Sequence, residues 1–170
     1  MPTLIATPGA TNANSYATLA EALTYHESHL YASVWENADD DQKIVALIWA
    51  TRLLDEQQDW KGEKVSGLQA LRWPRSYAED CDGYSIDSVT IPLSLKNATA
   101  ELARHLLTKD RLQVMDDNVA GLKSVTAGSV SVEFSSMDRI DLFPPSVDQM
   151  LRCLTSTSSV SGMIVPLRRA

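Results

Sequence analysis

Three stretches of the sequence carry apolar residues at the three- and four-residue spacing of an amphipathic helix, and they constrain the fold more than any other feature. The first begins at the capping-box motif of Thr18 and predicts a helix over about 18–32. The second follows an acidic run that suits a helix N-terminus, and it extends to about Gln57. The third opens at Pro92, which suits the first turn of a helix, and ends near Asp110. The pattern therefore predicts a mainly α protein built as a small helical bundle.

Two regions outside these helices have other patterns. Helical periodicity is lost over 59–91, where single glycines and scattered charges predict a long connection of a kind that is often functional in compact domains. Short β-rich runs lie on either side of residues 127–129, and the second of them alternates apolar and polar side chains, which predicts a β-hairpin near 122–134. A last short helix is expected after Pro144 and Pro145.

The two ends of the chain differ in composition from its middle. Residues 1–14 are small and polar with two prolines, which predicts an extended lead-in to a helical domain over 15–154. Residues 155–162 are almost all Ser and Thr, a composition typical of a flexible linker, and an apolar segment with two arginines follows. We therefore expect 155–170 to form a linker and an extended docking arm. The residues of this arm that we expect to dock on a partner are Met163, Ile164, Val165, Leu167, Arg168 and Arg169.

Charge and hydropathy narrow the classes of function. Lys and Arg total 15 against 22 Asp and Glu, giving a net charge of −7. This balance argues against tight nucleic-acid binding, because affinity for phosphates comes from basic side chains. The sequence has no run of about 18 apolar residues and no basic leader, so we expect neither a membrane span nor export. Cys81 and Cys153 lie far apart in the sequence, and we expect both to be free thiols in a reducing compartment.

No pattern of reactive residues points to catalysis. His26 and His29 have a spacing that could place two imidazoles on one metal, but no pattern supplies a third ligand, and His105 lies far along the chain. We therefore expect solvated or partly packed histidines. The sequence contains neither a Gly-x-Ser-x-Gly motif nor a glycine-rich phosphate loop. A protein that is not an enzyme and holds no metal or cofactor is expected.

The four tryptophans admit two interpretations. In the first, Trp49 belongs to the core while Trp60 and Trp73 pin the long connection onto it. In the second, some of them contact a neighbouring subunit, because aromatic side chains are common at the centre of interfaces. The sequence leaves both open. The residues that we expect to act as loop anchors or in a subunit interface are Trp60, Trp73, Arg75, Val130, Val132 and Phe134.

Several short motifs occur in the order found in one protein family. They are Ala13-Asn14-Ser15-Tyr16 before the first helix, residues 50–55 at the end of the second, Leu71-Arg72-Trp73-Pro74-Arg75 in the long connection, and residues 129–134 in the hairpin. Together they make the chain resemble the head-to-tail connector adaptor proteins of tailed bacteriophages over about residues 13–154. Members of this group are often labelled DnaT-like single-stranded DNA-binding proteins.

This resemblance implies a helical bundle with a projecting β-hairpin, many copies of which form a ring, commonly a dodecamer. The ring would lie in the virion neck beneath the portal protein and bind a tail-side connector, stopper or nozzle protein. Double-stranded DNA would pass through its lumen without sequence preference. The acidic balance of the chain fits such a conduit, because lumen carboxylates repel phosphates and let a duplex slide.

The alternative is a replication accessory protein that binds single-stranded DNA. Such a protein needs aromatic stacking platforms beside a basic groove. Arg72, Trp73 and Arg75 are the place where basic and aromatic residues interleave, so this segment would have to supply the platform.

Overall fold

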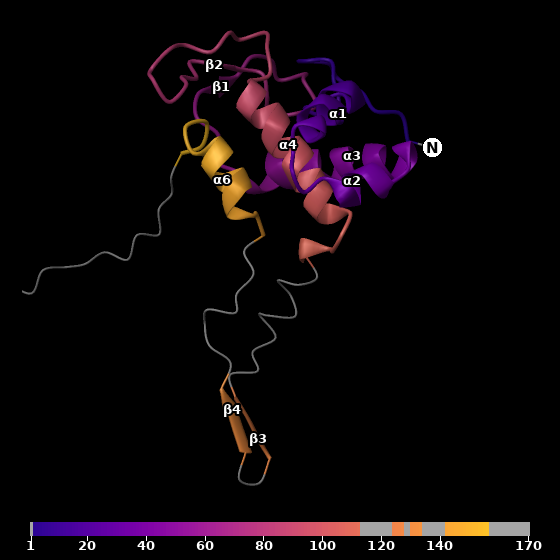
Figure 1. The fold of residues 1–170 in the computed structure, drawn as a ribbon. Coiled ribbons are helices and arrows are strands. Elements are labelled where there is room, and N and C mark those ends of the chain that lie inside the picture. The colour runs from indigo at the N-terminus through magenta and orange to yellow at the C-terminus, as the bar shows by residue number, and fades with distance from the viewer. Residues whose placement is uncertain (1, 113–123, 128–129, 134–141, 157–170) are drawn as a thin grey trace, which may run out of the picture.

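The computed structural model describes residues 2–112, 124–127, 130–133 and 142–156 (Figure 1). The prediction of a mainly α protein with a small β-hairpin is confirmed. The described helices are α1 (Leu19–Glu27), α2 (Ser33–Asn37), α3 (Asp40–Gln57), α4 (Leu93–Leu106) and α6 (Pro145–Leu151). The described strands are β1 (Glu63–Lys64), β2 (Arg75–Ser76), β3 (Ser124–Ala127) and β4 (Val130–Glu133).

The first predicted helix is shorter in the structure, and the separate short helix α2 begins only after its predicted end. The expected capping box is confirmed at Thr18, whose side chain accepts a hydrogen bond from the third helical residue while the side chain of that residue bonds back. α1 nevertheless ends at Glu27, because the Ser28 hydroxyl donates to the Tyr25 carbonyl at 3.0 Å and competes with the helical backbone bonds. The prediction of one helix over 18–32 was therefore wrong beyond Glu27.

α4 is the central helix of the bundle. It packs against α1, α3 and α6 (Figure 1). Ala98, Ala100 and Ala103 on α4 are buried, and their small side chains let the neighbouring helices approach closely. Several leucines of the core are fully buried. Truncating any one of them should lower the free energy of unfolding by about 2–5 kcal/mol. These leucines are Leu47 and Leu54 on α3, Leu95 and Leu102 on α4, and Leu151 on α6.

The long connection between α3 and α4 folds against the bundle through a small sheet. In it β1 and β2 pair antiparallel, with Glu63 opposite Ser76. Gly62 stands just before β1 with φ +72°, and a Cβ at this position would collide with the backbone of Ser76. The buried Gln69 closes the turn between the strands, since its amide nitrogen donates to Pro74 O at 3.0 Å.

The predicted hairpin is also confirmed. β3 and β4 pair antiparallel with Ser124 opposite Glu133, and Figure 1 shows them standing away from the helices. In the sequence the hairpin lies between α4 and α6. The described chain on either side of it is joined where Arg111 Nε donates to Leu142 O at 2.7 Å. A hydrogen bond thus links the chain just after α4 to the chain just before α6.

The expectation of two free thiols was wrong, because Cys81 and Cys153 form a disulfide. Their Cα atoms lie 5.1 Å apart although 72 residues separate them in sequence. The long connection makes a tight turn around Asp80, whose backbone amide donates to Tyr84 O at 2.9 Å, and this turn brings Cys81 to the end of α6. The pairing was not predicted because the two cysteines lie far apart in the sequence.

Candidate interaction surfaces

The segment where basic and aromatic residues interleave, residues 72–75, is packed into the protein. Trp73 is 1% exposed, and its ring meets that of Trp60 edge to face with centroids 5.9 Å apart. Trp60 is buried as well, beside its backbone bridge to Thr155. Neither ring is open to stack on a nucleic-acid base. The structure places both tryptophans in the core, where they hold the long connection.

Both arginines of this segment are committed to backbone carbonyls. Arg75 Nε donates to Lys61 O at 2.7 Å, and Arg75 Nη2 donates to Gly62 O at 2.5 Å. Arg72 Nη1 donates to Gln58 O at 3.1 Å. These bonds fasten the long connection to the chain that leaves α3. A phosphate would have to displace these hydrogen bonds, so the segment stabilises the fold and is a poor phosphate-binding site.

Asp55, near the end of α3, is the acceptor at the centre of this contact. Its carboxylate accepts from Arg72 N at 2.7 Å, and the Tyr16 hydroxyl donates to the same oxygen. Burial, together with the charge of Asp55, raises the pKa of Tyr16 well above its ordinary value, so the phenol remains a donor. Tyr16 N in turn donates to Thr51 Oγ1 at 3.1 Å. Three of the motifs that carry the family resemblance therefore meet in one packed unit.

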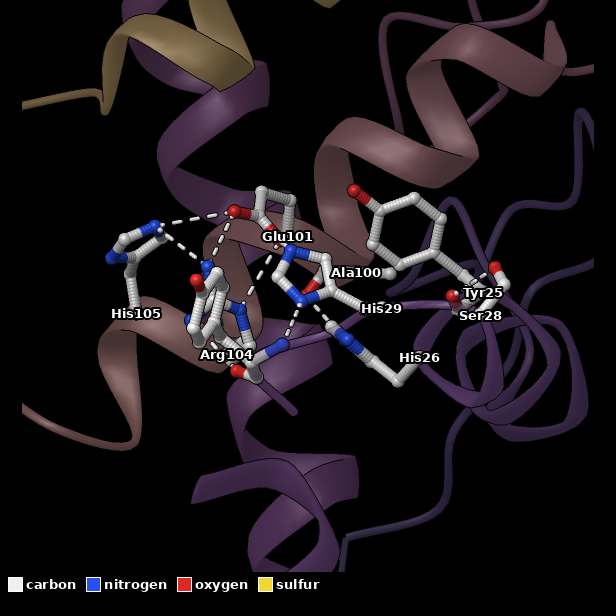
Figure 2. Close-up of polar contacts among 9 residues, drawn as sticks. Tyr25, His26, Ser28, His29, Ala100, Glu101, Arg104 and His105 are labelled. Atoms are coloured by element: carbon white, nitrogen blue, oxygen red, sulfur yellow. Dashed lines mark hydrogen bonds and ion pairs between the residues drawn. The ribbon is translucent and has the colours of Figure 1, made fainter. Parts of the chain in front are cut away.

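A second polar cluster surrounds the buried Glu101 on α4 (Figure 2). Its Oε1 lies 2.6 Å from Arg104 Nη2 and 3.3 Å from His105 Nε2, and its Oε2 lies 3.6 Å from His29 Nε2. Burial alone would raise the pKa of Glu101, but hydrogen bonds from His105 and Arg104 outweigh it and lower this pKa to about 2. His105, far from His29 in sequence, is thus brought to the same carboxylate.

His26 lies beside this cluster and is a core residue. Its ring lies 4.5 Å from the Trp35 ring, measured between centroids, and the residue is 2% exposed. Nε2 lies 3.1 Å from Ala100 O, which can only accept, so Nε2 carries the hydrogen. Burial lowers the pKa of His26 to about 4. His26 therefore packs in the core, whereas the His29 ring makes a separate contact with the Glu101 carboxylate.

The depressed pKa of His26 predicts a loss of stability in mild acid. In the unfolded chain this histidine is protonated below about pH 6.5, whereas in the folded chain it stays neutral down to about pH 4. Protonation therefore stabilises the unfolded state relative to the folded state as the pH falls through this window. Between pH 7 and pH 5.5 the free energy of unfolding should fall by about 1 kcal/mol. Urea titrations at both pH values measure it. His26→Gln, which keeps a donor for Ala100 O without the titration, should flatten the dependence; an unchanged slope would contradict this assignment.

An apolar groove lies between the N-terminal half of α3, α2 and the end of α4. Its volume is about 690 Å³. Val45, Trp49, Leu106 and Leu107 line it together with Val34. Val45 is 51% exposed and Trp49 is half-buried, so α3 leaves part of its apolar surface open here. An open apolar surface of this kind is typical of a binding site.

Carboxylates stand at one end of this groove. Asp39 and Asp41, at the start of α3, are among its lining residues. Arg52 lies on the far side of Trp49 along α3, with its guanidinium carbon 5.2 Å from the centre of a Trp49 ring. Trp49 and Arg52 are thus a second basic and aromatic pair, one that the sequence analysis missed. The signal was available, because Val45 and Trp49 are four apart and fall outside the apolar stripe of the helix.

Comparison with known proteins identifies the family. A protein-family model described as "Putative DnaT-like ssDNA binding protein" matches residues 3–170. The chain belongs to this family. The DnaT-like resemblance expected from the sequence is confirmed, and the phage connector role remains a prediction. No curated protein and no solved structure matches this DnaT-like chain.

The remaining predicted site residues of this DnaT-like protein lie in the hairpin and near the C-terminus. Val130 and Val132 belong to β4, which pairs with β3. The others fall outside the residues that the structure describes. They are Phe134, Met163, Ile164, Val165, Leu167, Arg168 and Arg169.

Within residues 2–112 and the shorter described segments, no group of three or more His, Cys, Asp or Glu side chains is placed to hold a metal ion. The helices of the described part are all too short or too polar to cross a membrane.

Proposed function

We propose that this DnaT-like protein is a head-to-tail adaptor in the neck of a tailed bacteriophage virion. Copies of it form a ring beneath the portal protein, double-stranded DNA passes through the ring, and a tail-side connector, stopper or nozzle protein attaches to it. Its function rests on contacts alone, with no catalytic step. The motif resemblance of residues 13–154 supports this role, and the family description leaves it open.

The observation that carries the proposal is the β3–β4 hairpin standing away from the helices (Figure 1). Each strand pairs with the other, and the described residues supply no third strand, so its outer edges offer backbone donors and acceptors. A closed ring requires two different surfaces on each copy, one of which meets the other on the next copy. The hairpin and the groove beside Val45 and Trp49 are two such surfaces.

The fate of the basic and aromatic segment supports the same conclusion. Arg72 and Arg75 bond backbone carbonyls, and Trp73 is buried, so the residues that the DNA-binding alternative would need as a stacking platform serve the fold. The net charge of −7 also disfavours a tight grip on phosphates. It is compatible with a conduit through which a duplex slides.

A single-stranded DNA-binding replication accessory is the second candidate function. The family description names this activity, and one surface feature favours it. Trp49 is half-buried with Arg52 against its ring, which is the combination that stacks on a base and pairs with a phosphate. Its acidic neighbours, Asp39 and Asp41 in the same groove, oppose that use.

The mass of the purified protein in solution, alone and with the portal protein of the same phage, tests the proposal. Native mass spectrometry should show a closed ring, either alone or on the portal, with no change on adding a labelled oligonucleotide. The opposite outcome is a monomer that ignores the portal and binds the oligonucleotide at moderate salt.

The oligonucleotide arm has its own matched variants. If the DNA-binding role holds, Arg52→Ala should weaken binding by about tenfold, since a stacked cation contributes about 1 kcal/mol or more. Arg152→Ala, at an exposed arginine beyond α6, is the control. Equal effects of the two substitutions would indicate non-specific charge attraction, and the adaptor role would stand.

A further inference from the structure

The groove beside α3 combines an apolar floor with acidic residues at one end. Val45, Trp49, Leu106 and Leu107 make the floor, and the remaining described residues leave it open. Asp39 and Asp41 stand where α3 begins. Asp39 already accepts from Gln42 N at 2.7 Å as the helix cap, so Asp41 is better placed to pair with an incoming cation. An occupant should therefore be an apolar segment flanked by positive charge.

The C-terminal sequence of this chain has that chemistry. Residues 163–167 are apolar and are followed at once by Arg168 and Arg169. A Ser- and Thr-rich stretch precedes them, a composition typical of a flexible linker. We propose that residues 163–169 of one copy occupy the groove of a neighbouring copy. The apolar side chains cover the floor, and the two arginines meet the carboxylates at the start of α3.

The length of the linker favours a neighbour over the same chain. The last described residue, Ser156, is held at the far end of α3, where its backbone amide donates to Asp59 O at 2.7 Å. In Figure 1, α6 and α2 lie on opposite sides of α4. The groove lies around Val45, about 20 Å away once the rise along α3 and the width of a helix are both counted. The seven steps from Ser156 to Met163 span at most about 25 Å.

Binding within one chain would therefore need the linker to reach about four fifths of its maximum span. A flexible linker of that length has a typical end-to-end distance of about 15 Å, so this extension carries an entropic cost. A neighbouring copy in a ring removes the constraint, because its tail can start beside the groove. The arrangement is head-to-tail, with groove and tail on different surfaces, as closed rings require. The inference rests on the proposed self-assembly and names the surfaces that carry it.

Two variants of the full-length chain test the proposal. Val45→Lys places a charge on the groove floor at a side chain that is 51% exposed, so the fold should tolerate it. Leu167→Glu places the opposite change on the tail. Val89→Lys, at a valine that is 64% exposed outside the groove, is the matched control. Each of the first two variants should weaken self-association at least about tenfold, measured by light scattering over a dilution series, and the control should assemble normally.

Mixing the two variants separates neighbour from self. An equimolar mixture of Val45→Lys and Leu167→Glu retains one intact groove and one intact tail on different chains, so it should form heterodimers. Loss of assembly in each variant alone with no recovery in the mixture would overturn the proposal. Normal rings in either variant would also overturn it, while leaving the adaptor role intact. Portal attachment lost in Val45→Lys with self-association unchanged would assign the groove to the portal instead.

A wild-type protein that stays monomeric would instead count against self-assembly itself. In that case a synthetic peptide of residues 157–170, titrated into the full chain while its tryptophan fluorescence is recorded, tests the groove directly, because Trp49 lines it. Saturable binding that Val45→Lys abolishes would support the groove and tail pairing. Absence of binding would overturn it.

Discussion

Removing the Cys81–Cys153 disulfide should lower the free energy of unfolding by about 4 kcal/mol, because the bond closes a loop of 72 residues in the unfolded chain. The double variant Cys81→Ser/Cys153→Ser makes the change without a reducing agent. The loop that the disulfide closes includes the whole of α4. Opening it therefore raises the conformational entropy of the unfolded chain over a large part of the sequence. Urea denaturation of wild type and variant, followed by circular dichroism at pH 7, gives the difference.

The state of the cysteines has to be established alongside. Titration of thiols in the denatured, unreduced protein should find none, and a reducing agent should destabilise wild type while leaving the double serine variant unchanged. Two free thiols in freshly purified protein would contradict the disulfide. A stability change below about 1 kcal/mol would mean that the unfolded chain is already restricted near these residues.

Replacing Glu101 with alanine should destabilise the protein by about 3 kcal/mol, because it leaves the Arg104 guanidinium and two histidines without their shared carboxylate. The pKa of Glu101 gives a matching magnitude. It falls from 4.5 to about 2 on folding, a shift that corresponds to about 3 kcal/mol. This contribution is present above about pH 4.5 and is lost as the pH falls toward 2. Thermal and urea denaturation at pH 7 and pH 3 measure both aspects.

Glu27→Ala is the matched control for Glu101→Ala, since Glu27 is an exposed glutamate at the end of α1. It should change stability by less than about 0.5 kcal/mol. At pH 3 the difference between wild type and Glu101→Ala should shrink, because the carboxyl of the unfolded chain is then protonated while that of the folded chain is still ionised. Equal effects of the two substitutions at pH 7 would show that the Glu101 contacts are balanced by the cost of burying them.

The elements that sequence patterns predicted well are those specified by neighbouring residues. α3 and α4 follow from apolar spacing and from local signals such as the Asp39 cap and the proline before Leu93. The hairpin follows from β-rich runs on both sides of a glycine, the second of which alternates apolar and polar side chains. The end of α1 failed because one serine hydroxyl competes for a backbone carbonyl, an effect too small to change the periodicity.

The features that could not be predicted depend on contacts between distant residues. The sequence shows neither that His29 and His105 share Glu101, nor that Cys81 reaches Cys153, because both pairings depend on how the long connection and α4 pack. The role of Arg72 and Arg75 depends on such contacts as well. Their spacing with Trp73 is compatible with a nucleic-acid platform, and only the carbonyls around them show that they serve the fold. For Trp49 the sequence left a core and a surface role open, and the structure shows it packed against the core while it lines an open groove.

The hairpin region is a modular insert in the bundle, because a hydrogen bond joins the described chain on either side of it. α4 and α6 pack on each other, and the bond from Arg111 to Leu142 O links the chain just after α4 to the chain just before α6. Residues between these points can therefore change in number without moving the helices, since a longer loop adds little to the entropy of closure. Selection, or a protein engineer, can alter how far the hairpin reaches toward another molecule while the helical core keeps its sequence.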